Sequence, residues 1–309
     1  MAKIVRFYEY GGPEVLRIEE APAQQPGKGE VRLRVQAIGL NRAESMFFHN
    51  QYLEQPKLPS RLGYEAAGVV EALGPDVDES WLGKQVATVP AFSMNTYGTV
   101  GEQAVAPVSA LGEYPAKLSA VEGAAIWMQY LTAYGALIEI CNLAQGDFVI
   151  ITAASSSVGI AAIEIAKTEG AISIATTRTS QKRKELYALG ADHVIACEEE
   201  DFLARVNEIT AGKGARVVFD PVAGPFVNTL VEATARHGII VEYGLLSGQA
   251  TPFPVVPAIA KGLTIRGYTL IEILLCTKSS RLQKSIFGIA CRMDGFGRRS
   301  RRRFRLRRR

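Results

Sequence analysis

The stretch "VIITAASSSVGIAAIEIAKTEGAISIATTRTS", residues 149–180, decides the fold of this chain. It opens with an apolar run rich in β-branched residues and then passes through five small residues at 153–157. Apolar residues at helical spacing follow, and a second β-type run ends the stretch. This order predicts a strand, a tight turn, a helix and a second strand. Such a βαβ unit belongs to a parallel sheet, because parallel strands need a crossover connection.

The turn at 153–157 has the position of a dinucleotide-binding turn but lacks most of its glycines. Where three glycines usually stand, this chain has Ala154, Ser156 and Gly159. Phosphate groups need free backbone N–H groups at a helix N-terminus and small side chains that let them approach closely. Alanine and serine still meet both needs. The sequence therefore favours a bound pyrophosphate over the alternative, a strand–helix turn that binds nothing.

The end of the second strand indicates which dinucleotide this is. NAD-specific proteins usually end this strand with Asp or Glu, which accepts hydrogen bonds from the ribose 2′-hydroxyl. Here the strand ends "IATTRTSQKRK", with no acid but with Thr177, Arg178, Ser180 and Lys182 around that place. Arg178 would bind a phosphate on the 2′-hydroxyl, whereas a carboxylate would repel it. The sequence predicts NADP; the alternative is that these cations form a solvated first turn of a helix.

The chain divides into a β-rich part and an alternating part. Up to about residue 115 short β-type runs predominate, such as "EVRLRVQAIGLN", and they predict a compact, mostly β domain. From about residue 118 helical patterns alternate with six apolar runs, which predicts an α/β fold with a doubly wound parallel sheet. The six predicted strands are "DFVIIT", "AISIAT", "HVIA", "ARVVFD", "GIIVEYG" and "LTIRGYTL".

Length and composition limit the class of protein. The 309 residues are enough for two domains, and 48% apolar residues supply a full core and argue against disorder. No apolar run reaches the length of a membrane span, and residues 1–30 contain no signal-peptide core. The four cysteines have neither zinc-ligand spacing nor the pattern of a disulfide framework. We therefore expect a cytoplasmic protein that does not bind membranes.

The net charge of +4 comes from the C-terminal tail. Residues 292–309 hold ten arginines and one aspartate, and without them 25 basic residues face 30 acidic ones, a net charge of −5. The body of the chain therefore has no general affinity for nucleic acid. So many arginines in one tail are what a GC-rich gene gives when it is read in a shifted frame. The alternative is a basic arm that binds nucleic acid or an anionic membrane.

Eight motifs follow one another along the chain: "GGPEVL", "VQAIGLNRAE", "LGYEAAGVVEALG", "LTAYGAL", "GDFVIITAASSSVGIAAIEIAK", "LGADHVI", "VVFDPVAG" and "LTIRGYTL". In this order and spacing they resemble the medium-chain dehydrogenase/reductase superfamily, in particular its zinc-free quinone oxidoreductase branch. The resemblance implies a GroES-like β domain at 1–117, a Rossmann NADP-binding domain at 118–275, and an active site in the cleft between them. It also implies that 276–291 begins a return segment, cut short before a disordered tail at 292–309.

The resemblance also implies roles for individual residues. Asn41 and Thr132 would face the nicotinamide and its ribose. Tyr64 would touch the substrate oxygen, with plain aromatic packing as the alternative. The other expected cofactor-binding residues are Ser156, Ser157, Val158 and Gly159 at the pyrophosphate, Thr177, Arg178 and Lys182 at the 2′-phosphate, and Gly244, Leu245 and Leu246 at the nicotinamide pocket.

We do not expect a metal ion. Zinc-dependent alcohol dehydrogenases of the superfamily bind the catalytic metal with a cysteine after the "IGL" strand and a histidine in "GHE". Here Asn41 and Tyr64 stand in those places, and neither supplies a zinc donor. The region that carries the structural-zinc cysteines in relatives, "VPAFSMNTYGTVGEQAV", has no cysteine. Without a metal to stabilise an oxyanion, quinones and enones are easier to reduce than simple ketones.

These features predict an NADPH-dependent reductase of quinones, enones or related carbonyls. Two alternatives stay open: a dinucleotide-binding protein with little turnover because its C-terminus is cut short, and a nucleic-acid binder that acts through the tail. The alternating stretch "GLTIRGYTL", 262–270, would lie at the open edge of the Rossmann sheet. Unprotected edges invite pairing, so we also expect a homodimer.

Overall fold

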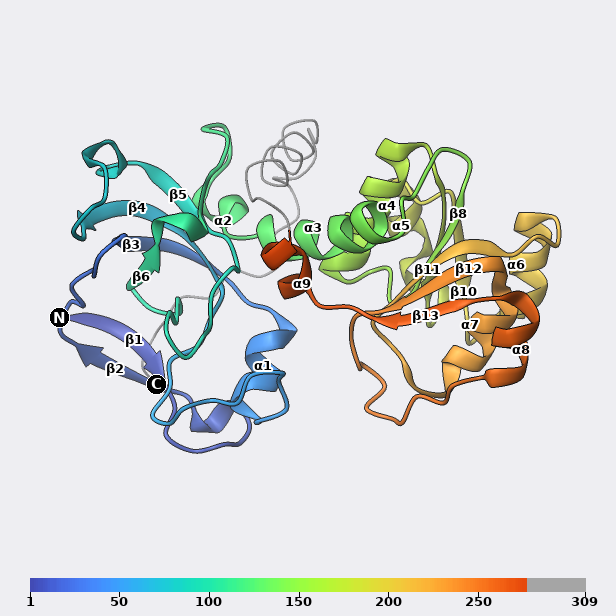
Figure 1. Ribbon diagram of the computed structural model, residues 1–309, viewed down its shortest axis with the longest axis horizontal. Helices are drawn as coiled ribbons and strands as arrows, with labels where there is room; N and C mark the ends of the chain where they lie inside the picture. The colour runs from blue at the N-terminus through green and yellow to red at the C-terminus, as the bar shows by residue number, and fades with distance from the viewer. Residues whose placement is uncertain (277–309) are drawn as a thin grey trace. The chain divides into compact units, whose positions relative to one another are not determined.

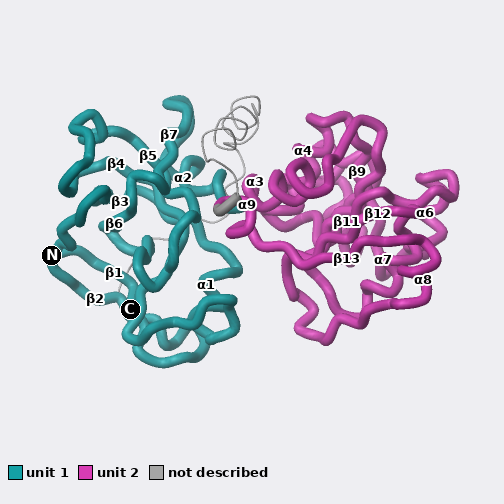
Figure 2. The backbone as a smooth tube through the Cα atoms, in the orientation of Figure 1, with its two compact units in different colours: residues 1–128, 279–309 teal, residues 129–278 magenta. Residues whose placement is uncertain are grey.

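The computed structural model describes residues 1–276, which form two compact units (Figure 2). The first is formed by Met1–Met128, and the second begins at Gln129. Beyond its first residue, the expected return segment at 276–291 lies outside the described residues, as does the arginine tail at 292–309. None of the helices within residues 1–276 combines the length and the apolar character that a membrane span requires.

The first unit is built mainly of antiparallel strands, as the alternating runs predict. A two-stranded sheet pairs β1 with β2, and a five-stranded sheet has the order β6–β3–β4–β5–β7. The strands are β1 (Ala2–Arg6), β2 (Arg17–Ala21), β3 (Glu30–Gly39), β4 (Glu65–Leu73), β5 (Gln85–Thr88), β6 (Gln103–Pro107) and β7 (Leu111–Glu113). The helices are α1 (Arg42–Phe48), α2 (Ala120–Gly123) and the start of α3 (Trp127–Tyr134).

Alternation along β3 places the core of this unit. Val31 and Leu33 are fully buried, whereas Arg34 points the other way and is exposed. The two apolar side chains pack in one cluster with Val70 of β4 and Val86 of β5. Each such burial contributes roughly 1.5–3 kcal/mol. The register is therefore fixed, because a slip by one residue would bring Arg34 into the core.

The second unit contains the predicted doubly wound sheet. Six parallel strands have the order β10–β9–β8–β11–β12–β13, and the direction of winding reverses between β8 and β11. The strands are β8 (Phe148–Ile151), β9 (Ile172–Thr177), β10 (His193–Ala196), β11 (Ala215–Asp220), β12 (Thr234–Glu242) and β13 (Thr264–Gly267). All six predicted strands are present, and the expected α/β class is confirmed.

Helices cover both faces of this sheet (Figure 1). They are α4 (Ser157–Glu169), α5 (Arg183–Ala188), α6 (Phe202–Thr210), α7 (Val227–Ala233) and α8 (Val255–Lys261). The last helix, α9 (Leu270–Cys276), follows β13 and contacts residues 135–140. Shorter helical turns are η1 (Pro13–Val15), η2 (Glu79–Trp81), η3 (Val108–Ala110), η4 (Gly135–Ile140), η5 (Ser180–Lys182) and η6 (Gly224–Phe226). Side chains from the strand centres, among them Ile150, Ile174 and Val218, are fully buried between the layers.

Close packing at the turn between β8 and α4 explains why one glycine is kept. A Cβ atom on Gly159 would lie 2.6 Å from the Cα atom of Ala154, which is backbone and has no freedom to move aside. Ser156 caps the helix, since its Oγ accepts from the Gly159 N–H at 3.1 Å. The helix ends at Gly170, whose φ of 72° is the left-handed conformation that glycine adopts freely. Thus only the third glycine position is sterically required here.

Candidate functional site

The carboxyl edge of the six-stranded sheet gathers most of the predicted cofactor-binding residues. Because the strands are parallel, their carboxyl ends lie along one edge. The turn after β8, the end of β9 and the loop after β12 all start from this edge, which includes the switch point between β8 and β11. Ligands of open α/β sheets bind at this kind of place.

The turn after β8 presents backbone donors from the first turn of α4. Ser157 and Val158 occupy the first helical positions, whose N–H groups have no acceptor within a helix. The Ser156 N–H, which the sequence assigned to the pyrophosphate, instead donates to the Ala153 carbonyl at 2.9 Å. Of the three expected donors, Ser157 and Val158 are therefore the two that the turn leaves available, and Ser156 serves as the helix cap.

Two cations from the end of β9 accompany this turn. Lys182 Nζ donates to Ser155 Oγ at 3.1 Å, so its ammonium lies directly at the turn. Arg178 is exposed and forms no ion pair within residues 1–276. Its neighbour Arg183, in contrast, is bound to the carboxylate of Glu200. The cations that follow β9 thus differ. Arg178 and Lys182 are available to an anionic ligand at this edge, whereas Arg183 is neutralised within the protein.

A carboxylate that the sequence did not single out also lies near the end of β9. Glu199 Oε1 accepts from the Ser180 N–H at 3.0 Å, and this hydrogen bond holds the pKa of the Glu199 carboxyl below its usual value. The contact joins the segment after β10 to the start of η5. No sequence signal pointed to it, because the two residues are nineteen positions apart and the bond uses a backbone donor.

The loop after β12 is held against the loop after β11. The Leu246 N–H donates to the Pro221 carbonyl at 2.9 Å, and a Cβ atom on Gly244 would lie 2.8 Å from that same oxygen. Leu245 and Leu246 are 52% and 47% exposed. They give the loop an apolar surface of the kind that a flat ring such as nicotinamide would contact.

Two acids that sequence reasoning missed, the fully buried Asp220 and the half-buried Glu242, end β11 and β12. Asp220 is fully buried and accepts from the Thr152 hydroxyl, from the Val222 N–H at 3.1 Å and from the Ala223 N–H at 2.8 Å. Burial, and then the neighbouring charge of Asp220, raise the pKa of Glu242 to about 8. The available signal was an acidic residue at the end of two adjacent parallel strands, "VVFD" and "IIVE".

In the first unit, a second buried carboxylate network brings Asn41 and Tyr64 together. The Asn41 N–H donates to Glu44 Oε2 at 2.6 Å, in a capping box that starts α1. The Tyr64 N–H donates to the other oxygen of Glu44 at 3.1 Å. The Asn41 amide Nδ2 donates to Glu65 Oε2 at 3.0 Å. Asn41 is thus held between two carboxylates, each only 3% exposed.

Burial controls the protonation of these two carboxyls. It raises the pKa of Glu44 and of Glu65 to about 7 in each case, against the lowering effect of the hydrogen bonds they accept. Glu65 Oε1 also accepts from the backbone N–H groups of Trp127 at 3.2 Å and Met128 at 2.8 Å, at the start of α3. Near neutral pH this network therefore gains or loses protons readily.

Tyr64 is 3% exposed and lies in an aromatic cluster. Its ring centroid is 6.3 Å from that of Tyr52 and 5.8 Å from that of Phe92. Burial raises the Tyr64 pKa far above its usual value. Tyr64 therefore keeps its proton at any physiological pH. Thr132, the remaining predicted residue, lies on α3 in the second unit and is 9% exposed.

The residues present do not fit a zinc ion. Asn41 offers an amide and Tyr64 a protonated phenol, and the amide is already bonded to two carboxylates. Within residues 1–276, no three His, Cys, Asp or Glu side chains are grouped so that they could hold a metal. Zinc sites in proteins use cysteine, histidine and carboxylate donors in tetrahedral arrangement.

Comparisons with known proteins match the chain to two family models and to several reductases. The family model described as "Alcohol dehydrogenase GroES-like domain" matches residues 27–134, and the one described as "Zinc-binding dehydrogenase" matches residues 157–284. Quinone oxidoreductase 1 of Escherichia coli is 34% identical over 251 residues, which cover 81% of this chain and 75% of that protein. A 2-haloacrylate reductase of a Burkholderia species is 31% identical over 277 residues, 88% of this chain and 80% of the relative.

Solved structures show the same similarity. The crystal structure of E. coli quinone oxidoreductase complexed with NADPH has a TM-score of 0.83 and 30% identity, and the match covers 94% of this chain and 88% of that one. A Pseudomonas syringae quinone oxidoreductase has a TM-score of 0.84 and 31% identity, covering 94% and 89%. Both the fold and the sequence thus point to one family.

Proposed function

The chain belongs to the quinone oxidoreductase-like branch of the medium-chain dehydrogenase/reductase superfamily, and from this premise we propose that it transfers hydride from NADPH to a quinone, an enone or a related carbonyl without zinc. It is an NADP-dependent oxidoreductase. The finer statements, which concern the class of acceptor, the independence from zinc and the roles of single residues, rest on the contacts described above.

The observation that carries the proposal is the contact between Lys182 and Ser155. It brings a cation from the end of the second strand to the turn whose helix N-terminus suits a pyrophosphate. Arg178, the residue directly after β9, supplies a guanidinium with no ion-pair partner in residues 1–276. A turn flanked by two unpaired cations suits a cofactor that carries a further phosphate.

The class of hydride acceptor is inferred from the polar groups of Asn41 and Tyr64. When bound, NADPH supplies the hydride. In a conjugated acceptor the negative charge that develops spreads over several atoms, so hydrogen bonds suffice where a simple ketone would need a metal. Tyr64, which keeps its proton, and the amide of Asn41 would serve as polar contacts rather than as acids. The proton that completes the reduction would come from water.

The remaining residues would position the reactants. Ser157 and Val158 would hold the pyrophosphate through backbone N–H groups. Gly244, Leu245 and Leu246 would give the nicotinamide an apolar support and exclude water. Thr132 would contact the ribose. The cytoplasmic location expected from the sequence also stays a prediction.

The test is a screen of NADPH oxidation with quinones, enones and aldehydes, and of NADP⁺ reduction with secondary alcohols, each with and without a zinc chelator. We expect turnover with quinones or enones, none with simple alcohols, and no effect of the chelator. Tight NADPH binding without turnover would favour a binding protein. Chelator-sensitive turnover of alcohols would contradict the zinc-free mechanism. Salt-sensitive nucleic-acid binding lost on deletion of residues 292–309 would identify a role of the tail.

A further inference from the structure

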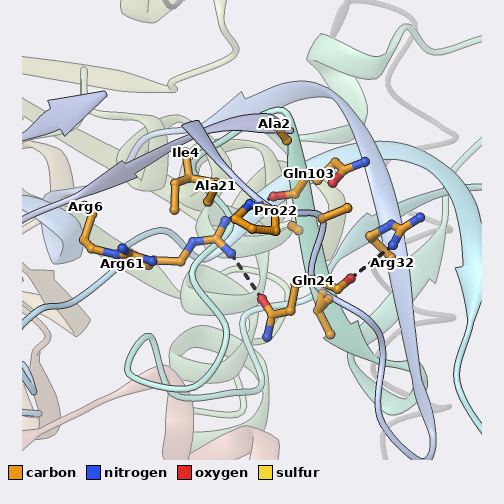
Figure 3. Close-up of a pocket in the computed structure, with 12 residues that line it drawn as sticks. Ala2, Ile4, Arg6, Ala21, Pro22, Gln24, Arg32, Arg61 and Gln103 are labelled. Atoms are coloured by element: carbon orange, nitrogen blue, oxygen red, sulfur yellow. Dashed lines mark hydrogen bonds between the residues drawn. The ribbon is translucent and has the colours of Figure 1, made fainter. Parts of the chain in front are cut away.

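A cavity of about 300 Å³ opens in the first unit (Figure 3), and the residues that line it include none of those assigned to cofactor and substrate. It is lined by β1, β3 and β6, by the segment after β2 and by Arg61. None of its lining residues within 1–276 is acidic, and three of them, Arg6, Arg32 and Arg61, carry a positive charge. This volume is at the lower end of the range for small-molecule sites.

Two of the three arginines are neutralised within the protein. Arg6 pairs with Glu19 at 2.6 Å, and Arg32 pairs with Glu71 at 2.7 Å. Arg61 differs, because no carboxylate lies within ion-pair distance of it in residues 1–276.

Among the described residues, Arg61 contacts neutral groups only. Its Nη2 donates to the Gln103 carbonyl at 3.1 Å, and its Nη1 has a long contact of 3.5 Å to Gln24 Oε1 (Figure 3). Its Nε is buried and has no acceptor in the part of the chain that the structure describes. Burial, together with the neighbouring charge of Arg6, lowers the Arg61 pKa to about 10. Arg61 is half-buried, and a partly desolvated cation without a counter-charge in residues 1–276 is unfavourable, so an anion that reached it would be bound.

We propose that this cavity binds a small organic acid or phosphate ester, whose carboxylate or phosphate group pairs with the Arg61 guanidinium. A guanidinium presents two parallel N–H donors that match the oxygens of either anion, and the weakly bonded Nη1 is the donor that an incoming oxygen would use. Arg6 adds a second positive charge nearby. The size of the cavity favours a molecule of several heavy atoms over a bare ion.

The test measures anion binding by hydrogen exchange, so it needs no enzymatic turnover. Inorganic phosphate and succinate are titrated separately against chloride at constant ionic strength. We expect saturable protection of residues 21–24 and 58–62 in the first unit. Any phosphate bound at the cofactor site would instead protect 153–158 and 177–182, so the two sites are read independently. Protection by both anions indicates a general anion site, and protection by only one names the group that is recognised.

Arg61→Gln should lower the affinity for the anion by roughly 10- to 150-fold, the range for a charge-assisted hydrogen bond. The affinity is read from the protection of residues 21–24 and 58–62. Arg34→Gln is the matched control, because this substitution removes the same charge at an exposed position on β3 that does not line the cavity. In anion-free buffer Arg61→Gln should also raise the unfolding midpoint, because it removes a half-buried charge that has no counter-charge within residues 1–276. If the glutamine variant does not fold, Arg61→Lys is used in its place. This variant keeps the charge and should retain anion binding.

Three results would overturn the proposal: no protection of the first unit by either anion, an unchanged response in Arg61→Gln, or loss of binding in Arg34→Gln to the same extent. A lower midpoint of Arg61→Gln in anion-free buffer would show that the guanidinium is already satisfied by neutral partners. None of these results depends on NADPH oxidation, so a failed reductase assay leaves the anion site testable.

Discussion

The amide Nδ2 of Asn41 donates to Glu65 Oε2 at 3.0 Å, which ties the start of α1 to a carboxylate buried on β4. Through its other oxygen Glu65 also accepts from two N–H groups at the start of α3. One buried carboxyl therefore organises three segments of the first unit. A group so placed links the stability of this unit to its own state of protonation.

Glu65→Gln should flatten the pH dependence of stability. The folded-state pKa of Glu65 is raised to about 7, above the usual value near 4.5, so between these pH values the folded state holds a proton that the unfolded state has lost. Wild-type stability should thus fall as pH rises from about 4.5 to 7, by up to about 1.4 kcal/mol per pH unit for each such proton. Glutamine has no charge to titrate and still offers an acceptor to the Met128 N–H.

Denaturant unfolding at pH 5 and pH 8 measures this effect. The difference between the two pH values should be smaller in Glu65→Gln than in the wild type. Glu9→Gln, at an exposed position, is the control and should match the wild type. Because Glu44 has a raised pKa of about 7 for the same reason, part of the slope should remain in the variant. An identical pH difference in Glu65→Gln and wild type would contradict the assignment.

Gly159→Ala should destabilise the second unit by roughly 1–3 kcal/mol, the range for overpacking. The added Cβ would lie 2.6 Å from Ala154 Cα, so the first turn of α4 must shift. That shift would also displace the N–H groups of Ser157 and Val158 and so weaken NADPH binding. Urea unfolding and a fluorescence titration with NADPH measure the two effects. Gly267→Ala, where a Cβ would meet nothing within 4 Å, is the control for the glycine-to-alanine change itself.

The sequence predicted the second unit well because its signals are local. Runs such as "DFVIIT" and "ARVVFD" are apolar throughout, and strands buried on both faces require this composition. The turn after β8 was predicted for a similar reason, since small side chains and one required glycine are visible in the sequence. The two cations that follow β9, Arg178 and Lys182, could be predicted once the end of this strand was located in the sequence.

The buried acids could not be predicted in the same way. Glu44, Glu65, Asp220 and Glu242 look like ordinary surface residues in the sequence, and their burial depends on what the rest of the chain places over them. The role of Ser156 was also missed in part, because its N–H turns inward to Ala153. Arg61 likewise gains its significance only from the absence of a carboxylate around it in residues 1–276.

We expect a homodimer that extends the six-stranded sheet. β13 is the last strand in the sheet order, so one of its edges has no partner strand within residues 1–276. Static light scattering at micromolar concentration should give twice the chain mass. Amides of residues 264–267 should also exchange more slowly as the protein concentration rises. A measured mass equal to that of one chain at micromolar concentration would contradict the prediction.

NADPH should bind more tightly than NADH, chiefly because of Arg178. This side chain is exposed at the end of β9, has no ion pair in residues 1–276, and presents a planar fork that fits a phosphate. A charge-assisted hydrogen bond contributes roughly 1.5–3 kcal/mol, which corresponds to a factor of about 10 to 150 in affinity. Arg178→Ala should therefore weaken NADPH binding by about this factor and leave NADH binding nearly unchanged.

Calorimetric titration of both cofactors separates Arg178 from its neighbours. Lys184→Ala, which removes an exposed cation two residues beyond Lys182, should leave both affinities as they are. Lys182→Ala should weaken NADPH and NADH alike if its ammonium acts at the pyrophosphate through its position beside Ser155, since both cofactors carry that group. Equal affinity of the wild type for the two cofactors, or unchanged NADPH affinity in Arg178→Ala, would show that the 2′-phosphate is bound elsewhere.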